Sequence, residues 1–87
     1  MVYRIQIVRT AQKQILSLSR DVQIEIAQNI DSLALIPRPT GCKKLHGVDL
    51  WRLRLGRYRV VYQVNDETRL IIVLKIALRK EDTYRGL

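Results

Sequence analysis

Four arginines stand within eight residues of one short stretch, and their spacing suits the binding of an anion. They are Arg52, Arg54, Arg57 and Arg59. Arginine stays charged in proteins, and its planar guanidinium makes two parallel hydrogen bonds to a phosphate. Apolar residues separate the arginines, as on a strand with one polar face. The first chemistry to consider is therefore phosphate binding, together with stabilisation of negative charge that develops on the phosphate.

A two-residue turn at Gly56-Arg57 predicts how this stretch folds. Glycine at the first central position suits a type II′ turn, which joins two antiparallel strands. The turn fixes three apolar cross-strand pairs on the core face of the hairpin, namely Leu55–Tyr58, Leu53–Val60 and Trp51–Tyr62. Such pairs stabilise a sheet, so the register is consistent with a folded core.

The same register places Arg54 opposite Arg59, and Arg52 opposite Val61, on the other face of the hairpin. Like charges directly opposite each other destabilise a sheet. An anion bound between Arg54 and Arg59 would remove the repulsion and gain charge-assisted hydrogen bonds. Arginines are also common on solvated strand faces, where their long side chains tolerate proximity. Taken alone, this pair fits both interpretations equally.

The whole chain is basic, and its charge is concentrated. Sixteen Lys and Arg against eight Asp and Glu give a net charge of +8, and eleven of the sixteen are arginine. Residues 38–59 hold seven basic residues and one acid, which is +6 in 22 residues and leaves +2 for the other 65. Such a field attracts a polyanion: nucleic acid, an acidic protein or an anionic membrane surface.

Length and composition predict one domain, spanning residues 1–87, with a single modest core. No apolar run approaches the roughly 20 residues that span a bilayer, and the start lacks the long apolar region of a signal peptide. The single cysteine, Cys42, forms no intramolecular disulfide, which fits a reducing compartment. We therefore expect a cytoplasmic protein that contacts no membrane. One cysteine and one histidine are too few to predict a metal site, and no cofactor is expected.

The elements that would carry the hairpin follow from hydrophobic periodicity. Residues 2–8 alternate as a strand does. Thr10 can cap a helix that runs to about Ser17, with Ala11, Ile15 and Leu18 at helical spacing. Ser19 is a second N-cap, and the helix that follows runs to about residue 34 with a buried stripe of Val22, Ile26, Ile30 and Leu33.

The second half of the chain predicts strands. A loop rich in proline and glycine, beginning at Pro37, is followed by strand-like runs at about 49–55, 58–64 and 69–77, with a turn at Asn65-Asp66-Glu67. The run at 69–77 is apolar on both sides, as in a central strand covered on both faces. The order β-α-α-β-β-β predicts an α+β fold: an antiparallel sheet with an N-terminal helical hairpin packed on it.

The C-terminal segment adds residues that could join the arginines. Arg79 follows the last strand, with Tyr84 and Arg85 just beyond. A tyrosine near several arginines has its phenolate favoured, so Tyr84 is a candidate proton acceptor. It could equally stack on a base or be an ordinary half-exposed packing residue.

These segments together resemble the RelE/ParE superfamily of bacterial toxins, and within it the RelE-like branch. The resemblance covers essentially the whole chain and rests on "PRPTGCKKLHG", "WRLRLGRYRVVYQV" and "IALRKEDTYR". The middle block is the most specific, because RelE-like toxins carry alternating basic residues on one strand and then Gly-x-Tyr-Arg, two hydrophobic residues and Tyr.

The resemblance implies a toxin of a type II toxin-antitoxin system that cuts mRNA in the ribosomal A site. In the implied metal-free mechanism, the ribose 2′-hydroxyl attacks the adjacent phosphate. The catalytic residues carried over by position are Arg52 and Arg54 (the paired basic positions), Arg59 (phosphate support), Arg79 (near the leaving group) and Tyr84 (base or stacking partner). The other basic residues expected to bind RNA are Arg38, Lys43, Lys44, Arg57 and Arg85.

This sequence also departs from the family pattern. The paired positions are often lysine in the family, whereas Arg52 and Arg54 remain charged and are poor proton carriers. Many relatives have histidine before the late arginine, where this chain has Leu78. His46 lies in the loop before the hairpin, where the pattern requires no catalyst, and Cys42 has no base beside it in the sequence that could activate a thiol nucleophile.

Two alternative functions stay open at this stage. A ParE-like poison of DNA gyrase would share the fold but act by binding a protein. A non-catalytic basic module would act only in an antitoxin complex that regulates its own operon. Under either toxin interpretation we expect a cognate antitoxin that is acidic or amphipathic and partly disordered alone. The other expected partners are the ribosome and mRNA, with operator DNA reached only through the antitoxin complex.

Overall fold

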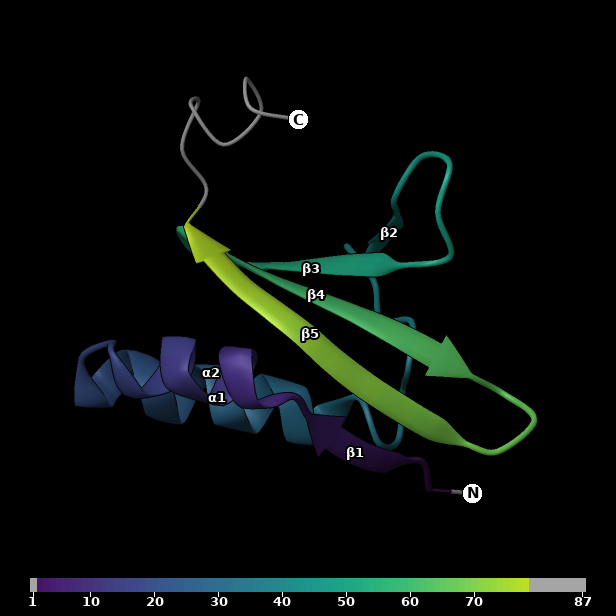
Figure 1. Ribbon diagram of the computed structural model, residues 1–87, viewed down its shortest axis with the longest axis horizontal. Helices are drawn as coiled ribbons and strands as arrows, with labels where there is room; N and C mark the ends of the chain where they lie inside the picture. The colour runs from purple at the N-terminus through teal and green to yellow at the C-terminus, as the bar shows by residue number, and fades with distance from the viewer. Residues whose placement is uncertain (1, 79–87) are drawn as a thin grey trace.

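The computed structural model describes residues 2–78, which form two helices and a five-stranded sheet (Figure 1). The strands are β1 (Arg4–Ile7), β2 (Lys43–Lys44), β3 (Trp51–Leu55), β4 (Tyr58–Asn65) and β5 (Leu70–Leu78). The helices are α1 (Arg9–Leu16) and α2 (Arg20–Ser32). The α+β fold class predicted from the sequence is confirmed.

The sheet has the strand order β1-β5-β4-β3-β2, which makes β5 a central strand. The pairs β2–β3, β3–β4 and β4–β5 are antiparallel, as expected. β1 instead pairs parallel to β5, with Ile5 beside Ile71 and Ile7 beside Val73. The helices and three strands between β1 and β5 are long enough for the crossover that a parallel pair needs. The two-residue strand β2 was not predicted, because two lysines in a loop carry no periodic signal.

The two helices pack on one face of the sheet and form the core with it. The fully buried side chains include Ile26 and Ile30 of α2 and its C-cap residue Leu33, as the predicted stripe required, while Val22 is half-buried. From the sheet, Val60 and Tyr62 of β4 and Ile71 and Val73 of β5 join them. Because α1 and α2 are joined by three residues, they form a short helical hairpin along one side of the sheet (Figure 1).

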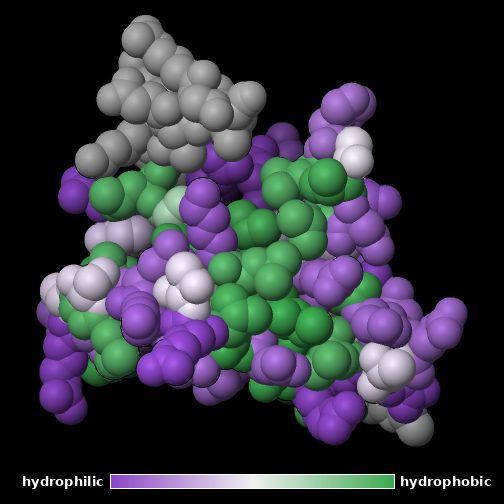
Figure 2. Space-filling model, in the orientation of Figure 1, coloured by the Kyte–Doolittle hydropathy of each residue, from purple (hydrophilic) through white to green (hydrophobic). Residues whose placement is uncertain are grey.

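β5 was expected to be covered on both faces, and in the part of the chain that the structure describes the helices cover only one. Ile71 and Val73 are buried beneath them, whereas Leu70 and Ile72 on the opposite face are half-buried. In the view of Figure 2, hydrophobic residues lie over the middle of β4 and β5 with hydrophilic residues around them. Neither helix within residues 2–78 is long and apolar enough to cross a membrane.

Of the two N-cap residues predicted for the helices, Thr10 is wrong and Ser19 is confirmed. α1 begins at Arg9 with Val8 as its N-cap, so Thr10 is inside the helix and not its cap. Val8 has an extended backbone and its carbonyl accepts the N–H of Gln12, which is the first helical hydrogen bond. Ser19 is the N-cap of α2 as predicted, although its side chain makes no capping hydrogen bond, and Asp21 lies in the first turn.

The turn between β4 and β5 also forms as predicted. The side-chain oxygen of Asn65 accepts the backbone N–H of Thr68 at 3.0 Å, a local bond typical of asparagine in turns. Arg69 ends the turn with a φ of 56°, a left-handed conformation.

Candidate functional site

The predicted hairpin forms with the predicted register. Trp51 pairs with Tyr62, Leu53 with Val60 and Leu55 with Tyr58, and the other face holds the pairs Arg54–Arg59 and Arg52–Val61. Gly56 has a φ of 60°, the sign that the first central position of a type II′ turn needs. A residue with a side chain would be strained at this φ, which explains the glycine. The turn therefore fixes which arginines share a face.

The four arginines of the hairpin differ in how much of each side chain is exposed to solvent. Arg59 is 7% exposed, while Arg54, directly opposite it, is exposed to solvent. Arg52 is half-buried, and Arg57 in the turn is exposed. On the other side of Arg59, the paired residue of β5 is Ala77, which has a small side chain. A buried arginine and an exposed arginine therefore lie directly opposite each other in the sheet.

Further cations share this side of the sheet. Lys43 of β2 pairs with Arg52, and Lys75 of β5 pairs with Val61, which places both on the side of Arg54 and Arg59. We call this surface the arginine face: Lys43, Arg52, Arg54, Arg59 and Lys75. Among the described residues of β2 to β5, no carboxylate lies on that side. A surface with cations only is suited to a polyanion.

Sequence reasoning missed Lys75. The signal that could have found it is the single charge inside an otherwise apolar strand, together with pairing across two strands. Lys44, in contrast, points to the other side of the sheet from Lys43, and its amino group lies 3.8 Å from the Asp49 carboxylate.

Arg38 is held by an ion pair and an aromatic ring. Its guanidinium donates two hydrogen bonds to the Asp66 carboxylate, at 3.2 and 2.8 Å, and lies 5.0 Å from the centre of the Trp51 ring. The Tyr3 hydroxyl donates to the same carboxylate at 2.5 Å. The Arg38 hydrogen bond, followed by that of Tyr3, lowers the pKa of Asp66. Asp66 thus offsets part of the Arg38 charge, and the role of Arg38 in RNA binding stays a prediction.

A hydrogen bond from Tyr62 holds the loop that leads from α2 to β2. Its hydroxyl donates to the Pro37 carbonyl at 2.8 Å, and the ring is fully buried. Burial, and next the Cys42 thiol beside it, raise the pKa of the Tyr62 phenol. A neutral hydroxyl that donates in the core is the form that burial favours. This bond fixes the start of the loop from which β2 continues.

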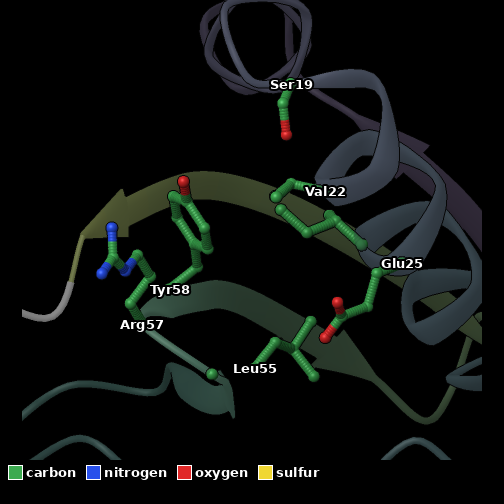
Figure 3. Close-up of a pocket in the computed structure, with 8 residues that line it drawn as sticks. Ser19, Val22, Glu25, Leu55, Arg57 and Tyr58 are labelled. Atoms are coloured by element: carbon green, nitrogen blue, oxygen red, sulfur yellow. The ribbon is translucent and has the colours of Figure 1, made fainter.

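A groove of about 440 Å³ separates α2 from the tip of the hairpin (Figure 3). Val22 and Ile26 line it from the helix, and Leu55 and Tyr58 line it from the strands. In Figure 3, Glu25 extends from the helix toward the strands, whereas the Arg57 side chain extends from the turn, beyond Tyr58 and away from the helix. The groove is apolar inside with one charge of each sign at its edge, so it differs in character from the arginine face.

Three of the predicted site residues, Arg79, Tyr84 and Arg85, lie outside the described residues. The structure brings Arg52, Arg54 and Arg59 together and adds Lys43 to them, while Arg38 lies near Trp51 at the far end of β3. His46 is exposed in the loop between β2 and β3. Within residues 2–78, no group of three or more His, Cys, Asp and Glu side chains could hold a metal ion.

Comparison with known families gives a match over most of the chain. The sequence profile of the family described as "ParE toxin of type II toxin-antitoxin system, parDE" matches residues 3–83. No curated protein sequence matches significantly.

Solved structures match closely over the whole domain. The chain is similar to the archaeal RelE of the RelE–RelB complex from Pyrococcus horikoshii, with 34% identity, a TM-score of 0.85 and coverage of 93% of this chain and 99% of that one. The isolated E. coli RelE toxin matches with 26% identity, a TM-score of 0.76 and coverage of 97% and 94%. A YoeB/ParE toxin from Agrobacterium tumefaciens shares the fold, at 15% identity, a TM-score of 0.75 and coverage of 88% and 99%.

Proposed function

The chain belongs to the RelE/ParE superfamily of type II toxins, and from this premise we propose that it is a ribosome-dependent endoribonuclease. The proposed reaction is the cleavage of mRNA in the ribosomal A site, which stops translation. The observation that carries the proposal is the pair Arg54–Arg59, one exposed and one buried, within a face of five cations. Two guanidinium groups at one sheet position form a clamp for the oxygens of a phosphate.

The proposed chemistry needs no metal. The 2′-oxygen of a ribose forms a bond to the adjacent phosphorus while the bond from phosphorus to the 5′-oxygen of the next nucleotide breaks. The products are a 2′,3′-cyclic phosphate and a 5′-hydroxyl. Arg54 and Arg59 bind the non-bridging oxygens and stabilise the charge that grows on them in the transition state. Arg52 and Lys43 hold the flanking phosphates.

Groups other than Arg52, Arg54 and Arg59 must transfer the protons, because arginine does not lose its proton near neutral pH. In the proposal, Tyr84 accepts the proton of the 2′-hydroxyl or stacks on a base, and Arg79 lies near the leaving oxygen. The remaining predicted RNA contacts are Arg38, Arg57 and Arg85, together with Lys44, which lies on the other side of the sheet from the arginine face and would contact a different part of the RNA. A nuclease of this kind gains most of its rate from positioning and electrostatics, which suits a site made of cations.

The natural partner in this proposal is a cognate antitoxin. The P. horikoshii relative is a RelE in complex with RelB, and E. coli RelE has been solved in a RelBE toxin-antitoxin complex. With a net charge of +8, this chain favours an antitoxin segment that is acidic or amphipathic. We place the pair in the cytoplasm, where the antitoxin would bring the complex to operator DNA.

A ParE-like poison of DNA gyrase is the second candidate. The observation in its favour is the family profile, which is described as a ParE toxin. Such a toxin would act by binding a protein, and it would not need Arg54 opposite Arg59. The identity of 34% with an archaeal RelE and 26% with E. coli RelE supports the nuclease instead.

The test uses ribosomes programmed with a defined mRNA and an empty A site, with the mRNA ends mapped by primer extension. The wild-type protein is compared with Arg59→Ala and Tyr84→Phe. Arg20→Ala is the matched control, because it removes an exposed arginine at the start of α2, away from the arginine face.

We expect a cut within the A-site codon for the wild type and Arg20→Ala. Loss of one donor to a developing charge typically costs about 10²–10³ in rate, so Arg59→Ala should cut at least about 100-fold more slowly. Intact mRNA with folded wild-type protein would overturn the nuclease proposal. Inhibition of gyrase supercoiling by the same preparation would then favour the second candidate.

A further inference from the structure

The end of β5 needs a hydrogen-bond partner that the sheet itself does not supply. β1 covers the outer edge of β5 only as far as Val73, where Ile7 is the last paired residue and the N–H of Val8 donates to the Val73 carbonyl. The remaining residues of β5, from Leu74 to Leu78, continue past the end of β1. In Figure 1, α1 lies below the arrowhead half of β5, where β1 no longer reaches.

A bulge changes which backbone groups of β5 face this edge. Val61 pairs with Lys75 whereas Tyr62 pairs with Val73, so Leu74 is an extra residue in β5. One extra residue shifts the alternation of a strand by one position. Beyond the bulge, the N–H of Ile76 therefore points away from β4 and toward the uncovered edge. Ile76 is 6% exposed, so water does not replace a missing partner easily.

Gln14 of α1 supplies that partner. Its side-chain oxygen Oε1 accepts the N–H of Ile76 at 2.7 Å, and the bond is partly buried. Gln14 lies on the same helical face as Ala11 and Ile15, which pack against the core. A glutamine on an otherwise apolar helix face is unusual unless its amide is used. The hydrogen bond to the Ile76 N–H therefore accounts for the glutamine at this position.

The segment held by Gln14 is the one that borders Arg59. Ile76 pairs with Val60, Ala77 pairs with Arg59 itself and Leu78 pairs with Tyr58. The chain then continues directly into Arg79. We infer that Gln14 is a positioning residue of the arginine face: by holding the Ile76 N–H, it keeps the end of β5 in the register that seats Arg59 beside Ala77. The consequence for cleavage rests on the proposed function.

The test compares two changes of Gln14 that differ in one property. Gln14→Glu keeps an oxygen acceptor at the same distance from the backbone, whereas Gln14→Met keeps the length and removes the strong acceptor. Gln28→Met is the matched control, since Gln28 is exposed on α2. Tyr62→Phe serves as a stability control, because it weakens the fold at the Pro37 loop, away from the end of β5.

Four quantities are measured. They are the hydrogen-exchange rate of the Ile76 amide, the NMR signal of the Arg59 side-chain Nε–H, the single-turnover rate of mRNA cleavage at saturating protein, and the protein concentration that gives half of that rate. A misplacement of about 1 Å costs up to about 100-fold in rate, so Gln14→Met should cut at least about tenfold more slowly with little change in half-saturation. The Ile76 amide should exchange faster and the Arg59 signal should shift.

Gln14→Glu should keep all four quantities near the wild-type values. Gln28→Met and Tyr62→Phe should leave the Arg59 signal in place. The inference is overturned if Gln14→Met leaves the Ile76 amide and the Arg59 signal unchanged, or changes them no more than Tyr62→Phe does. If the wild type cuts no mRNA, the nuclease proposal fails. The exchange and Arg59 measurements then still decide whether Gln14 positions this face.

Discussion

Arg54 and Arg59 lie directly opposite each other on β3 and β4, and only Arg59 is buried. The arrangement costs stability in the free protein, since like charges repel across a strand pair. Under the proposed function, the two guanidinium groups would bind a single phosphate. The difference in burial then leads to different predictions for the two arginines.

Replacing Arg54 with glutamine should stabilise the free protein while it impairs cleavage. The change removes the repulsion, and relief of some tenths of a kcal/mol corresponds to a rise of about 1–3 °C in Tm for a domain of this size. Thermal denaturation at low and high salt measures it. The gain should shrink in high salt, because salt screens exposed charges.

Arg57→Gln is the control for Arg54→Gln, since Arg57 is an exposed arginine of the same hairpin that has no arginine opposite it. Its Tm should change less than that of Arg54→Gln. An unchanged or lower Tm for Arg54→Gln at low salt would show that the two guanidinium groups do not repel each other in the free protein.

Tyr62→Phe should destabilise the protein by about 1 kcal/mol, because it removes a buried hydroxyl that donates to the Pro37 carbonyl and leaves that carbonyl without its donor. Tyr3→Phe removes a hydroxyl whose hydrogen bond to Asp66 is exposed, so it should cost less. Urea denaturation of the three proteins gives both differences. Equal losses for the two variants would contradict the structural role assigned to Tyr62.

The same phenol predicts a loss of stability at alkaline pH. Burial raises the folded-state pKa of Tyr62 above the value of about 10 for an unfolded tyrosine. The folded state therefore holds its proton more tightly, and this contribution is complete below pH 10 and is lost as the pH rises above it. Denaturation at pH 9 and pH 11 should show a larger drop for the wild type than for Tyr62→Phe. A drop of equal size in the wild type and in Tyr62→Phe would contradict the raised pKa of Tyr62.

The register of the hairpin was predictable from the sequence because its information is local, although β3 begins at Trp51 and not at about residue 49. A two-residue turn at Gly56-Arg57 fixes the register, and alternation then assigns every side chain to a face. Sequence alone therefore groups Arg52, Arg54 and Arg59 on one face, and the observed strand pairing agrees. The stripe on α2 was likewise predictable, since Ile26, Ile30 and Leu33 repeat at helical spacing.

The features that sequence patterns miss depend on contacts between distant residues. The parallel pairing of β1 with β5 joins residues more than sixty positions apart, and no local pattern states its direction. The Gln14 bond to Ile76 joins residues 62 positions apart, and the Arg38–Asp66 pair joins residues 28 positions apart, so no local pattern predicts either contact.

The start of α1 was missed for a local reason. The residue type of Thr10 favours a cap, whereas the extended backbone of Val8 starts the helix two residues earlier.

The Arg38–Asp66 pair predicts a loss of stability at acid pH. The hydrogen bond from Arg38 lowers the folded-state pKa of Asp66 below the unfolded value of about 3.9. The contribution is present above that value and is lost as the pH falls through the folded-state pKa. Urea denaturation at pH 7 and pH 3 should show Asp66→Asn less stable than the wild type at pH 7 and closer to it at pH 3. A difference that persists undiminished at pH 3 would contradict the ion pair.

The sharpest prediction for the site compares lysine at the two opposed positions. Relatives that this chain resembles often carry lysine at the paired strand positions, so Arg54→Lys should keep most of the cleavage rate. Arg59 is 7% exposed, and a buried lysine is desolvated more unfavourably than arginine and cannot form the two-pronged contact to phosphate. Arg59→Lys should therefore cut at least about tenfold more slowly than Arg54→Lys.

Single-turnover cleavage on programmed ribosomes measures both variants, with circular dichroism to confirm that each is folded. Equal rates for Arg54→Lys and Arg59→Lys would mean that the site needs only positive charge and not the guanidinium at the buried position. The expected asymmetry has one physical origin: Arg59 is fixed in the sheet between Arg54 and Ala77, so its donors are already oriented, whereas Arg54 is exposed and can adjust to the phosphate. Preorganised donors contribute more to a developing charge than mobile ones do, which makes Arg59 the residue on which the rate should depend most.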